Sequence, residues 1–208
     1  MGFQGYSTEP TGKTREIAVI PSFILLALIV GALLYTIVIY NNLVSLKNAV
    51  SKAWANIDVL LKQRHDELPK LIETCKQYMK FEQETLEKVI QARAASANAR
   101  ESGDVKAVGQ AETNLRLGLG KLFAVAEAYP DLKTNQSFQQ LQARISGLEN
   151  SIADRREFYN ESVNNNNVRI EQFPDVIIAR FFGFKEAQLL QFGEDEKKDV
   201  DVKSLFTN

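Results

Sequence analysis

The sequence predicts an all-α protein in which a single N-terminal transmembrane helix precedes an elongated, antiparallel, up-and-down four-helix bundle and a short C-terminal helix. Three observations lead to this prediction. Residues 17–40 form one apolar run without a charged side chain. From residue 43 onward, apolar side chains recur in steps of three and four, which is the spacing of one helix face. The sequence also lacks the sustained alternation of apolar and polar residues that marks strands.

The apolar run, IAVIPSFILLALIVGALLYTIVIY, predicts a transmembrane helix over residues 17–40. At 1.5 Å per residue the helix extends roughly 36 Å, enough to cross a hydrocarbon core of about 30 Å. It is too long for a cleaved signal peptide, and no small-x-small cleavage site follows it. Pro21 lies in the first turns, where its missing N–H costs little. Residues 1–16 are expected to form a mobile N-terminal tail.

The charges that flank this helix do not define its orientation. Lys13 and Arg15 precede the helix, and Lys47 and Lys52 follow it. Because the more positive flank usually stays in the cytoplasm, this equal count leaves open the side of the membrane on which the bundle lies.

Four amphipathic stripes within residues 41–172 predict the helices of the bundle. The first stripe runs from Leu43 to Arg64, and the second begins at Leu68. The other apolar positions of these two stripes are Leu46, Val50, Ala53, Ile57, Leu60, Leu71, Ile72, Cys75, Tyr78, Met79, Leu86, Val89 and Ile90. The third and fourth stripes contain Val105, Val108, Leu115, Leu119, Leu122, Ala126, Tyr129, Phe138, Leu141, Ile145, Leu148, Ile152, Tyr159, Val163 and Ile170. Short connections between the stripes predict antiparallel neighbours.

Local signals mark the ends of these helices. Gly103 supplies a stop after the second stripe, and Asp104 supplies the N-cap of the third helix. Pro130 disfavours helix at the residue before it and so ends the third stripe. The fourth helix begins with Thr134 or Asn135 as its cap.

The stretch RHDELPKL, residues 64–71, contains the one histidine of the chain and admits two interpretations. In the first, Asp66 is the N-cap of a new helix with Pro69 in its first turn, and the stretch is a turn. In the second, one long helix continues, and Pro69 bends it by freeing the carbonyl of His65. Neither interpretation makes this a reactive site, because His65 has no second histidine for a metal site and no nucleophile held nearby.

Residues 173–192, FPDVIIARFFGFKEAQLLQF, predict a short, Phe-rich amphipathic helix with Pro174 at its first position. One apolar face is enough to cap a bundle, so the surplus apolar surface predicts a contact with another subunit or with the membrane. We expect self-association through Phe173, Ile177, Phe181, Phe182 and Phe184. The charged residues 193–208 are expected to form a flexible tail.

The composition argues against several functional classes. A net charge of −1 gives no electrostatic basis for binding nucleic acid. One cysteine, Cys75, excludes an internal disulfide and a CxxC metal site. HExxH, GxSxG and paired-carboxylate motifs are missing, and RLGLGKLF lacks the first glycine and the hydroxyl residue of a phosphate loop. The sequence therefore predicts no enzymatic activity, no cofactor and no metal.

Three blocks of the sequence carry a resemblance to a known family. They are YNNLVSLKNAVSKAWANIDVLLKQRHDELPKLIET, YPDLKTNQSFQQLQARISGLENSIADRREFYNESV and FPDVIIARFFGF. In this order they resemble the LemA family of bacterial membrane proteins. The family's patterns are matched by Arg64, Asp66, Pro69 and Leu71, and by Glu149, Asn150, Arg156, Tyr159 and Asn160.

The sequence departs from the family pattern at NNNNVRI, where a tyrosine is expected before an asparagine. The four asparagines at residues 164–167 are weak helix formers and favour a frayed or broken helix end. The alternative is a polar layer in which the side-chain amides form hydrogen bonds across the bundle.

The resemblance implies a membrane anchor and a mirror-variant up-and-down four-helix bundle, without a known catalytic activity. It also implies a single-pass protein of the bacterial plasma (inner) membrane, with a bundle on the cytoplasmic side. Members are linked to the cell envelope, to stress and, in some bacteria, to organelle-like membranes.

Sequence and resemblance together predict a non-enzymatic scaffold that contacts membrane lipid and self-associates into a homo-oligomer, in envelope organisation or the response to membrane stress. The alternative is a monomeric adaptor or sensor that binds a membrane protein partner such as a protease. The two hypotheses differ in one measurable property, because only the adaptor forms a stoichiometric hetero-complex without self-assembly.

Overall fold

The computed structural model describes residues 12–192, with side chains described from Pro21 onward. The predicted all-α class is confirmed, and no strand occurs among the described residues. The helices are α1 (Gly12–Tyr78), α2 (Gln83–Ser102), α3 (Val105–Ala126), α4 (Pro130–Lys133), α5 (Gln136–Glu171) and α6 (Asp175–Phe182). The expected tails over residues 1–11 and 193–208 lie outside the described residues.

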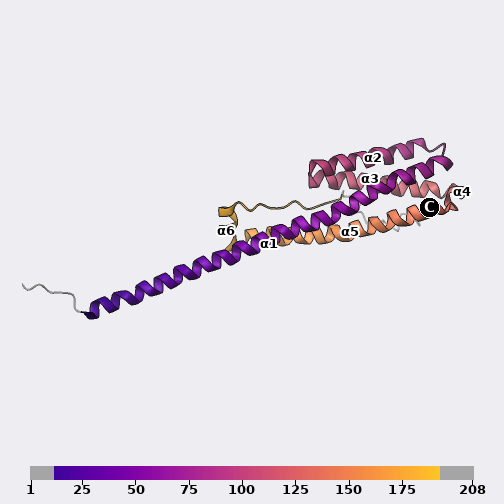
Figure 1. Ribbon diagram of the computed structural model, residues 1–208. Coiled ribbons are helices and arrows are strands. Elements are labelled where there is room, and N and C mark those ends of the chain that lie inside the picture. Colours follow the sequence, from indigo (N-terminus) through magenta and orange to yellow (C-terminus); the bar gives the residue numbers. More distant parts are fainter. Residues whose placement is uncertain (1–11, 193–208) are drawn as a thin grey trace, which may run out of the picture.

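Helix α1 is a single helix of 67 residues that joins the apolar run directly to the first amphipathic stripe. Within the described range it is the one helix long and apolar enough to cross a membrane. Its large apolar side chains from Phe23 to Val38 are exposed by 46% to 67%, and Ile39 and Leu43 are the first buried ones. Figure 1 shows this part of α1 projecting from the rest of the molecule. An exposed apolar surface of this length fits a segment that crosses a membrane.

Helix α1 continues without interruption through RHDELPKL, so this stretch is not a turn and Asp66 is not an N-cap. Asp66 and Pro69 both lie inside the helix. Pro69 has no N–H to bond the carbonyl of His65, four residues earlier. Instead, Nε of Arg93 in α2 donates a hydrogen bond to that carbonyl oxygen at 3.0 Å. The helix persists because a neighbouring helix supplies the donor that proline removes.

The chain first reverses after Tyr78, where residues 79–82 connect α1 to α2. No glycine or proline marks this turn. Met79 is buried on one side of it, whereas Phe81 is 94% exposed on the other. The second predicted stripe is therefore divided between the distal end of α1 and the start of α2.

The predicted caps of the later helices are confirmed. Gly103 adopts a left-handed conformation with φ of 69°, which ends α2. Asp104 caps α3, because its carboxylate accepts a hydrogen bond from the N–H of Lys106 at 2.9 Å. Asn135 caps α5 by accepting from the N–H of Phe138 at 3.0 Å.

Helices α1 and α5 lie side by side, and the hairpin of α2 and α3 covers the part of this pair farthest from the apolar run (Figure 1). The long helices run in alternating directions along the chain. A distal core contains Leu68, Leu71, Cys75, Val89, Leu115, Leu122, Phe138 and Ile145, among others. A central core contains Ala53, Ile57, Leu61, Val108, Ile152, Tyr159, Val163 and Leu190, among others. A third cluster, beside the end of the apolar run, contains Ile39, Leu43, Ile170 and Ala179.

The predicted C-terminal helix is shorter than expected, because α6 covers only Asp175–Phe182 and Pro174 precedes it. Gly183 ends the helix in a left-handed conformation with φ of 71°. Residues 183–192, called the strap below, then run as non-helical chain back along the helices (Figure 1).

Candidate functional site

The surface beside the end of the apolar run combines residues from three distant parts of the chain. Tyr40 of α1 packs on Phe182 of α6, with ring centroids 4.8 Å apart, and on Phe184 of the strap at 5.8 Å. These aromatic contacts place α6 at the point where α1 leaves its exposed apolar segment. We call this region the membrane-proximal surface.

An ion pair with a buried carboxylate and a small buried side chain fix α6 in this position. Asp175, at the start of α6, is 2% exposed, and its Oδ2 pairs with Arg169 near the end of α5. Ala179, one turn later, is buried against Ile39 and Leu43 of α1. A carboxylate at a helix N-terminus also interacts favourably with the helix dipole.

The five residues predicted to form a contact divide into two groups. Phe173 and Phe181 are both 82% exposed, and Ile177 is 57% exposed. Phe182 is half-exposed and Phe184 is more buried, because both pack on Tyr40. The first group remains available for a contact, whereas the second group attaches α6 to α1.

Two asparagines of α5 hold the strap through its backbone. The side-chain amide of Asn167 donates to the carbonyl of Ala187 and accepts from its N–H, both at 2.9 Å. Asn160 makes the same pair of hydrogen bonds with Leu190, at 3.1 and 2.8 Å. The distance between the two asparagines along α5 matches the distance between their partners along the strap. Seven helical residues, from Asn160 to Asn167, rise about 10.5 Å, and three extended residues, from Ala187 to Leu190, span about 10 Å.

The NNNN run is therefore part of a polar attachment site, and the prediction of a broken helix end is wrong. Helix α5 continues to Glu171. The four asparagines were visible in the sequence as an unusual polar run. Their partner could not be predicted, because Ala187 lies 20 residues from Asn167 and no local sequence pattern identifies it.

Packing of the strap adds to these hydrogen bonds. Leu190 is 1% exposed and belongs to the central core. Gly109 of α3 permits close approach of the strap, because a Cβ there would lie 2.1 Å from the carbonyl oxygen of Gln191. The guanidinium of Arg156 lies 4.2 Å from the ring centroid of Phe192, a cation–π distance.

A buried ionic cluster connects the four long helices between the central core and the distal core. Arg64 of α1 is 1% exposed and pairs with Glu112 of α3 and Glu149 of α5. Ser96 of α2 donates its hydroxyl to Glu112. Burial by itself lowers the pKa of Arg64, but the two carboxylates outweigh burial and raise that pKa above its ordinary value. The cluster links residues of all four helices, and the sequence did not reveal it because Arg64 looked like the end of an apolar stripe.

Burial shifts the pKa of both the one cysteine and the one histidine of the sequence. Burial raises the pKa of the Cys75 thiol to about 12, so the nucleophilic thiolate is scarce at neutral pH. Burial and the charge of Arg93 lower the pKa of His65. Asp66 is exposed and lies beside His65 in a shallow hollow with Asp58 and Arg100, which pair with each other at 2.8 Å.

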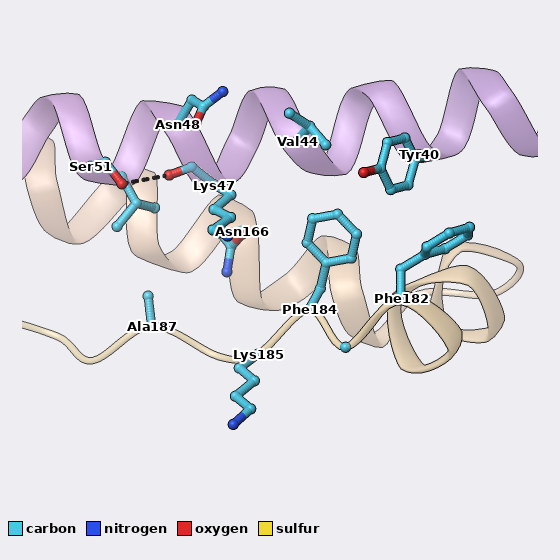
Figure 2. A pocket seen from close by; sticks show the side chains of 12 residues that line it. Tyr40, Val44, Lys47, Asn48, Ser51, Asn166, Phe182, Phe184, Lys185 and Ala187 are labelled. Carbon is cyan, nitrogen blue, oxygen red and sulfur yellow. Dashed lines mark hydrogen bonds between the residues drawn. The ribbon is translucent and has the colours of Figure 1, made fainter.

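A groove of about 630 Å³ opens between α1 and the strap at the membrane-proximal surface. Figure 2 shows Tyr40, Phe182 and Phe184 at one end of the groove and Lys47 farther along α1. The base is formed in part by Asn166, which is 4% exposed.

Comparison with known proteins identifies relatives over most of the chain. Protein LemA of Metamycoplasma hominis is 29% identical over 167 residues, which is 79% of this chain and 74% of that protein. Magnetosome protein MamQ 2 of Paramagnetospirillum magneticum is 33% identical over 89 residues, which is 43% of this chain. Magnetosome protein MamQ of Magnetospirillum gryphiswaldense is 30% identical over 88 residues. The matched segments are about a third of the length of both MamQ proteins (33% and 32%).

The family model of LemA matches residues 53–204, a range that begins within α1 and includes α2 to α6 and the strap. The resemblance expected from the three sequence blocks is confirmed. Arg64 and Glu149, which belong to two different family patterns, meet in the buried ionic cluster. From this match, and from the similarity to protein LemA over most of its length, the chain belongs to the LemA family.

Proposed function

We propose that this protein is a non-enzymatic, membrane-anchored scaffold whose antiparallel four-helix bundle stands on the bacterial plasma membrane and self-associates laterally. The observation that carries the proposal is an exposed apolar surface beside the end of the apolar part of α1. It is made of Ile177 and Phe181 of α6 and of Phe173, which precedes that helix. Similarity to magnetosome proteins of two bacteria supports a role at a membrane. Envelope organisation and the response to membrane stress are the processes that fit such a scaffold.

The continuity of α1 supports a rigid attachment. No loop separates the apolar segment from the bundle, because α1 remains helical from Gly12 to Tyr78. From Tyr40 to Tyr78 the helix rises about 57 Å. Bundles of neighbouring copies are therefore held at a defined angle to the membrane and at a common height, which favours lateral contact.

The proposed contact is one that copies in the same membrane can reach. Phe181 packs on Phe182, which contacts Tyr40 at the end of the apolar segment, so lateral diffusion in the membrane can bring this surface of two copies together. Large exposed aromatic side chains contribute most of the binding energy at many protein interfaces. Phe182 and Phe184 support this face from behind by packing on Tyr40.

The test is the mass of the full-length protein in nanodiscs, measured by light scattering and particle imaging. We expect a large, uniform homo-oligomer that Phe173→Ser with Phe181→Ser converts to smaller species at unchanged helicity. The control is Phe81→Ser, which alters a phenylalanine that is even more exposed and lies far from the membrane-proximal surface. A monomeric wild-type protein, or an assembly that the double substitution leaves intact, contradicts the proposal.

A second candidate function is a monomeric adaptor or sensor for a membrane partner such as a protease. The observation that favours it is the exposed phenylalanine of the turn between α1 and α2, Phe81, which is 94% exposed at the distal end of the molecule. This function predicts a stoichiometric hetero-complex that Phe81→Ser disrupts.

A compartment-sensitive reporter fused to Asn208 tests the cytoplasmic position of the bundle that we propose.

A further inference from the structure

The groove at the membrane-proximal surface has an uneven distribution of polarity. Its membrane end is formed by Tyr40 and Val44 of α1 and by Phe182 and Phe184. Farther from the apolar segment its walls carry polar and cationic groups, of which Lys47 is the first. The polarity of the groove thus changes from aromatic to cationic in the direction that leads away from the membrane.

The charge of the groove is purely positive. The remaining lining residues are Asn48, Val50, Ser51, Asn166, Gly183, Lys185 and Ala187, so the set contains two lysines and no carboxylate. Glu186 follows Lys185 in the strap but does not line this groove. In the part of the chain that the structure describes, neither lysine forms an ion pair.

The two lysines differ in their placement. Figure 2 shows Lys47 extending from α1 toward the strap, across the groove, and Lys185 pointing outward from the rim. Ser51 is not an available donor in this arrangement, because its hydroxyl donates to the carbonyl of Lys47 at 3.2 Å. Lys47 is therefore the main cationic group of the groove, and Lys185 adds to the local positive potential.

We propose that this groove binds the headgroup of an anionic phospholipid from the leaflet next to the bundle, with Lys47 contacting the phosphate and Tyr40, Phe182 and Phe184 contacting the glycerol and upper acyl region. The proposal rests on the membrane anchoring proposed above. It is independent of self-association, because the groove does not use Phe173, Ile177 or Phe181.

The dimensions agree with this occupant. Lys47 lies seven residues, or about 10 Å, beyond Tyr40 along α1. The headgroup region of a bilayer is about 5 to 8 Å thick on each side, and lysine side chains reach back toward it by snorkelling. Aromatic rings such as Tyr40 favour the boundary between hydrocarbon and headgroup. The groove opens at this boundary, so a lipid enters it without leaving the bilayer.

The test is native mass spectrometry of the full-length protein released from nanodiscs of phosphatidylglycerol or phosphatidylcholine with the same acyl chains. We expect preferential retention of phosphatidylglycerol, and a decrease of about fivefold in that preference for Lys47→Gln, since one lysine near an anionic surface contributes about this factor. Lys185→Gln is expected to have a smaller effect. The matched control is Lys52→Gln, which removes an exposed charge of α1 outside the groove.

Three outcomes overturn the proposal. They are equal retention of the two lipids by the wild type, an unchanged preference in Lys47→Gln, and loss of the bound lipid to competing inorganic phosphate, which would indicate a site for free phosphate. A vesicle flotation experiment with the same proteins distinguishes lipid binding in the groove from the proposed membrane anchoring. A protein that floats but retains no lipid selectively contradicts only the groove, whereas a protein that does not float contradicts both.

Discussion

Arg93 of α2 donates a hydrogen bond, 3.0 Å long, to the carbonyl oxygen of His65 in the last third of α1. This is the carbonyl that Pro69 leaves without its helical donor. The contact explains how α1 extends from the apolar segment to Tyr78 as one helix, and it couples α1 to α2 beside the ionic cluster of Arg64.

The first prediction concerns this contact. Arg93→Met leaves the His65 carbonyl without its donor and is expected to lower the free energy of unfolding by about 1 to 3 kcal/mol. Pro69→Ala restores a backbone N–H, so the effect of Arg93→Met should be smaller in that background. The wild type, the two single variants and the double variant are unfolded chemically in detergent, and circular dichroism monitors the unfolding. The four free energies of unfolding give the coupling energy between Arg93 and Pro69. Strictly additive effects would show that the proline and the arginine act independently.

The second prediction concerns the buried ionic cluster. Arg64→Met leaves the carboxylate of Glu112 buried without its cation, and we expect a loss of about 3 to 5 kcal/mol in the free energy of unfolding. Glu112→Gln in the same chain removes the uncompensated charge and should recover a large part of that loss. Glu149 needs no such correction, because its side chain is 20% exposed and can be hydrated. If Arg64→Met alone and Arg64→Met with Glu112→Gln are equally stable, the uncompensated charge of Glu112 is not the cause of the loss.

The third prediction concerns the attachment of the strap. Asn160→Ala and Asn167→Ala each remove both side-chain partners of one strap residue, with an expected loss of about 1 to 3 kcal/mol of local stability. Hydrogen exchange should accelerate at the amides of Ala187 and Leu190 while the helical content stays constant. Asn165→Ala is the control, since it changes an exposed member of the same asparagine run. Acceleration by the control to the same degree would indicate general loosening of α5.

The fourth prediction compares two glycines of α3. Gly109→Ala places a methyl group 2.1 Å from the backbone oxygen of Gln191, so the strap must move and its hydrogen exchange should increase. Gly120→Ala meets no atom within 4 Å and should stabilise the helix by about 0.8 to 1 kcal/mol. Melting curves and hydrogen exchange of both variants provide the measurement. A Gly109→Ala protein that keeps its strap protected contradicts the close approach.

The fifth prediction is a pH dependence that arises from His65. Burial and the nearby Arg93 lower the pKa of His65 in the folded protein below its ordinary value near 6.5. At a pH between the pKa of His65 in the folded protein and its pKa in the unfolded chain, the unfolded chain binds the proton more strongly. The contribution of neutral His65 to the free energy of unfolding is therefore complete above pH 6.5 and is lost as the pH falls through the folded pKa. His65→Gln should therefore reduce the loss of stability on acidification from about pH 7 to pH 5. Parallel pH profiles for the wild type and the variant would contradict this assignment.

Several parts of the fold were predictable because their causes are local. The charge-free segment, the three-four spacing after Leu43, and the caps at Asp104 and Asn135 each depend on side chains within a few residues of one another. The boundary between α1 and α2 was not predictable in this way. The sequence offers a proline at residue 69 and no breaker at residues 79–82, yet Arg93 keeps the first region helical and the chain reverses at the second.

The membrane-proximal surface was predicted only in part. The surplus of apolar residues over residues 173–192 was visible in the sequence, but not the division between Phe181, which is exposed, and Phe184, which packs on Tyr40. Lys47 was read only as a flanking charge, because the groove that it lines exists only when the strap returns beside α1.

The sequence by itself determined the all-α class, the apolar membrane segment and the family, since these follow from composition, periodicity and motifs along the chain. Only the tertiary structure decided that α1 is one helix, that Arg64 meets Glu112 and Glu149, and that Asn160 and Asn167 hold the strap. The physical reason is the distance along the chain between the partners. Hydrogen bonds and ion pairs between residues 20 to 85 positions apart leave no periodic trace in the sequence, because each depends on how the helices pack.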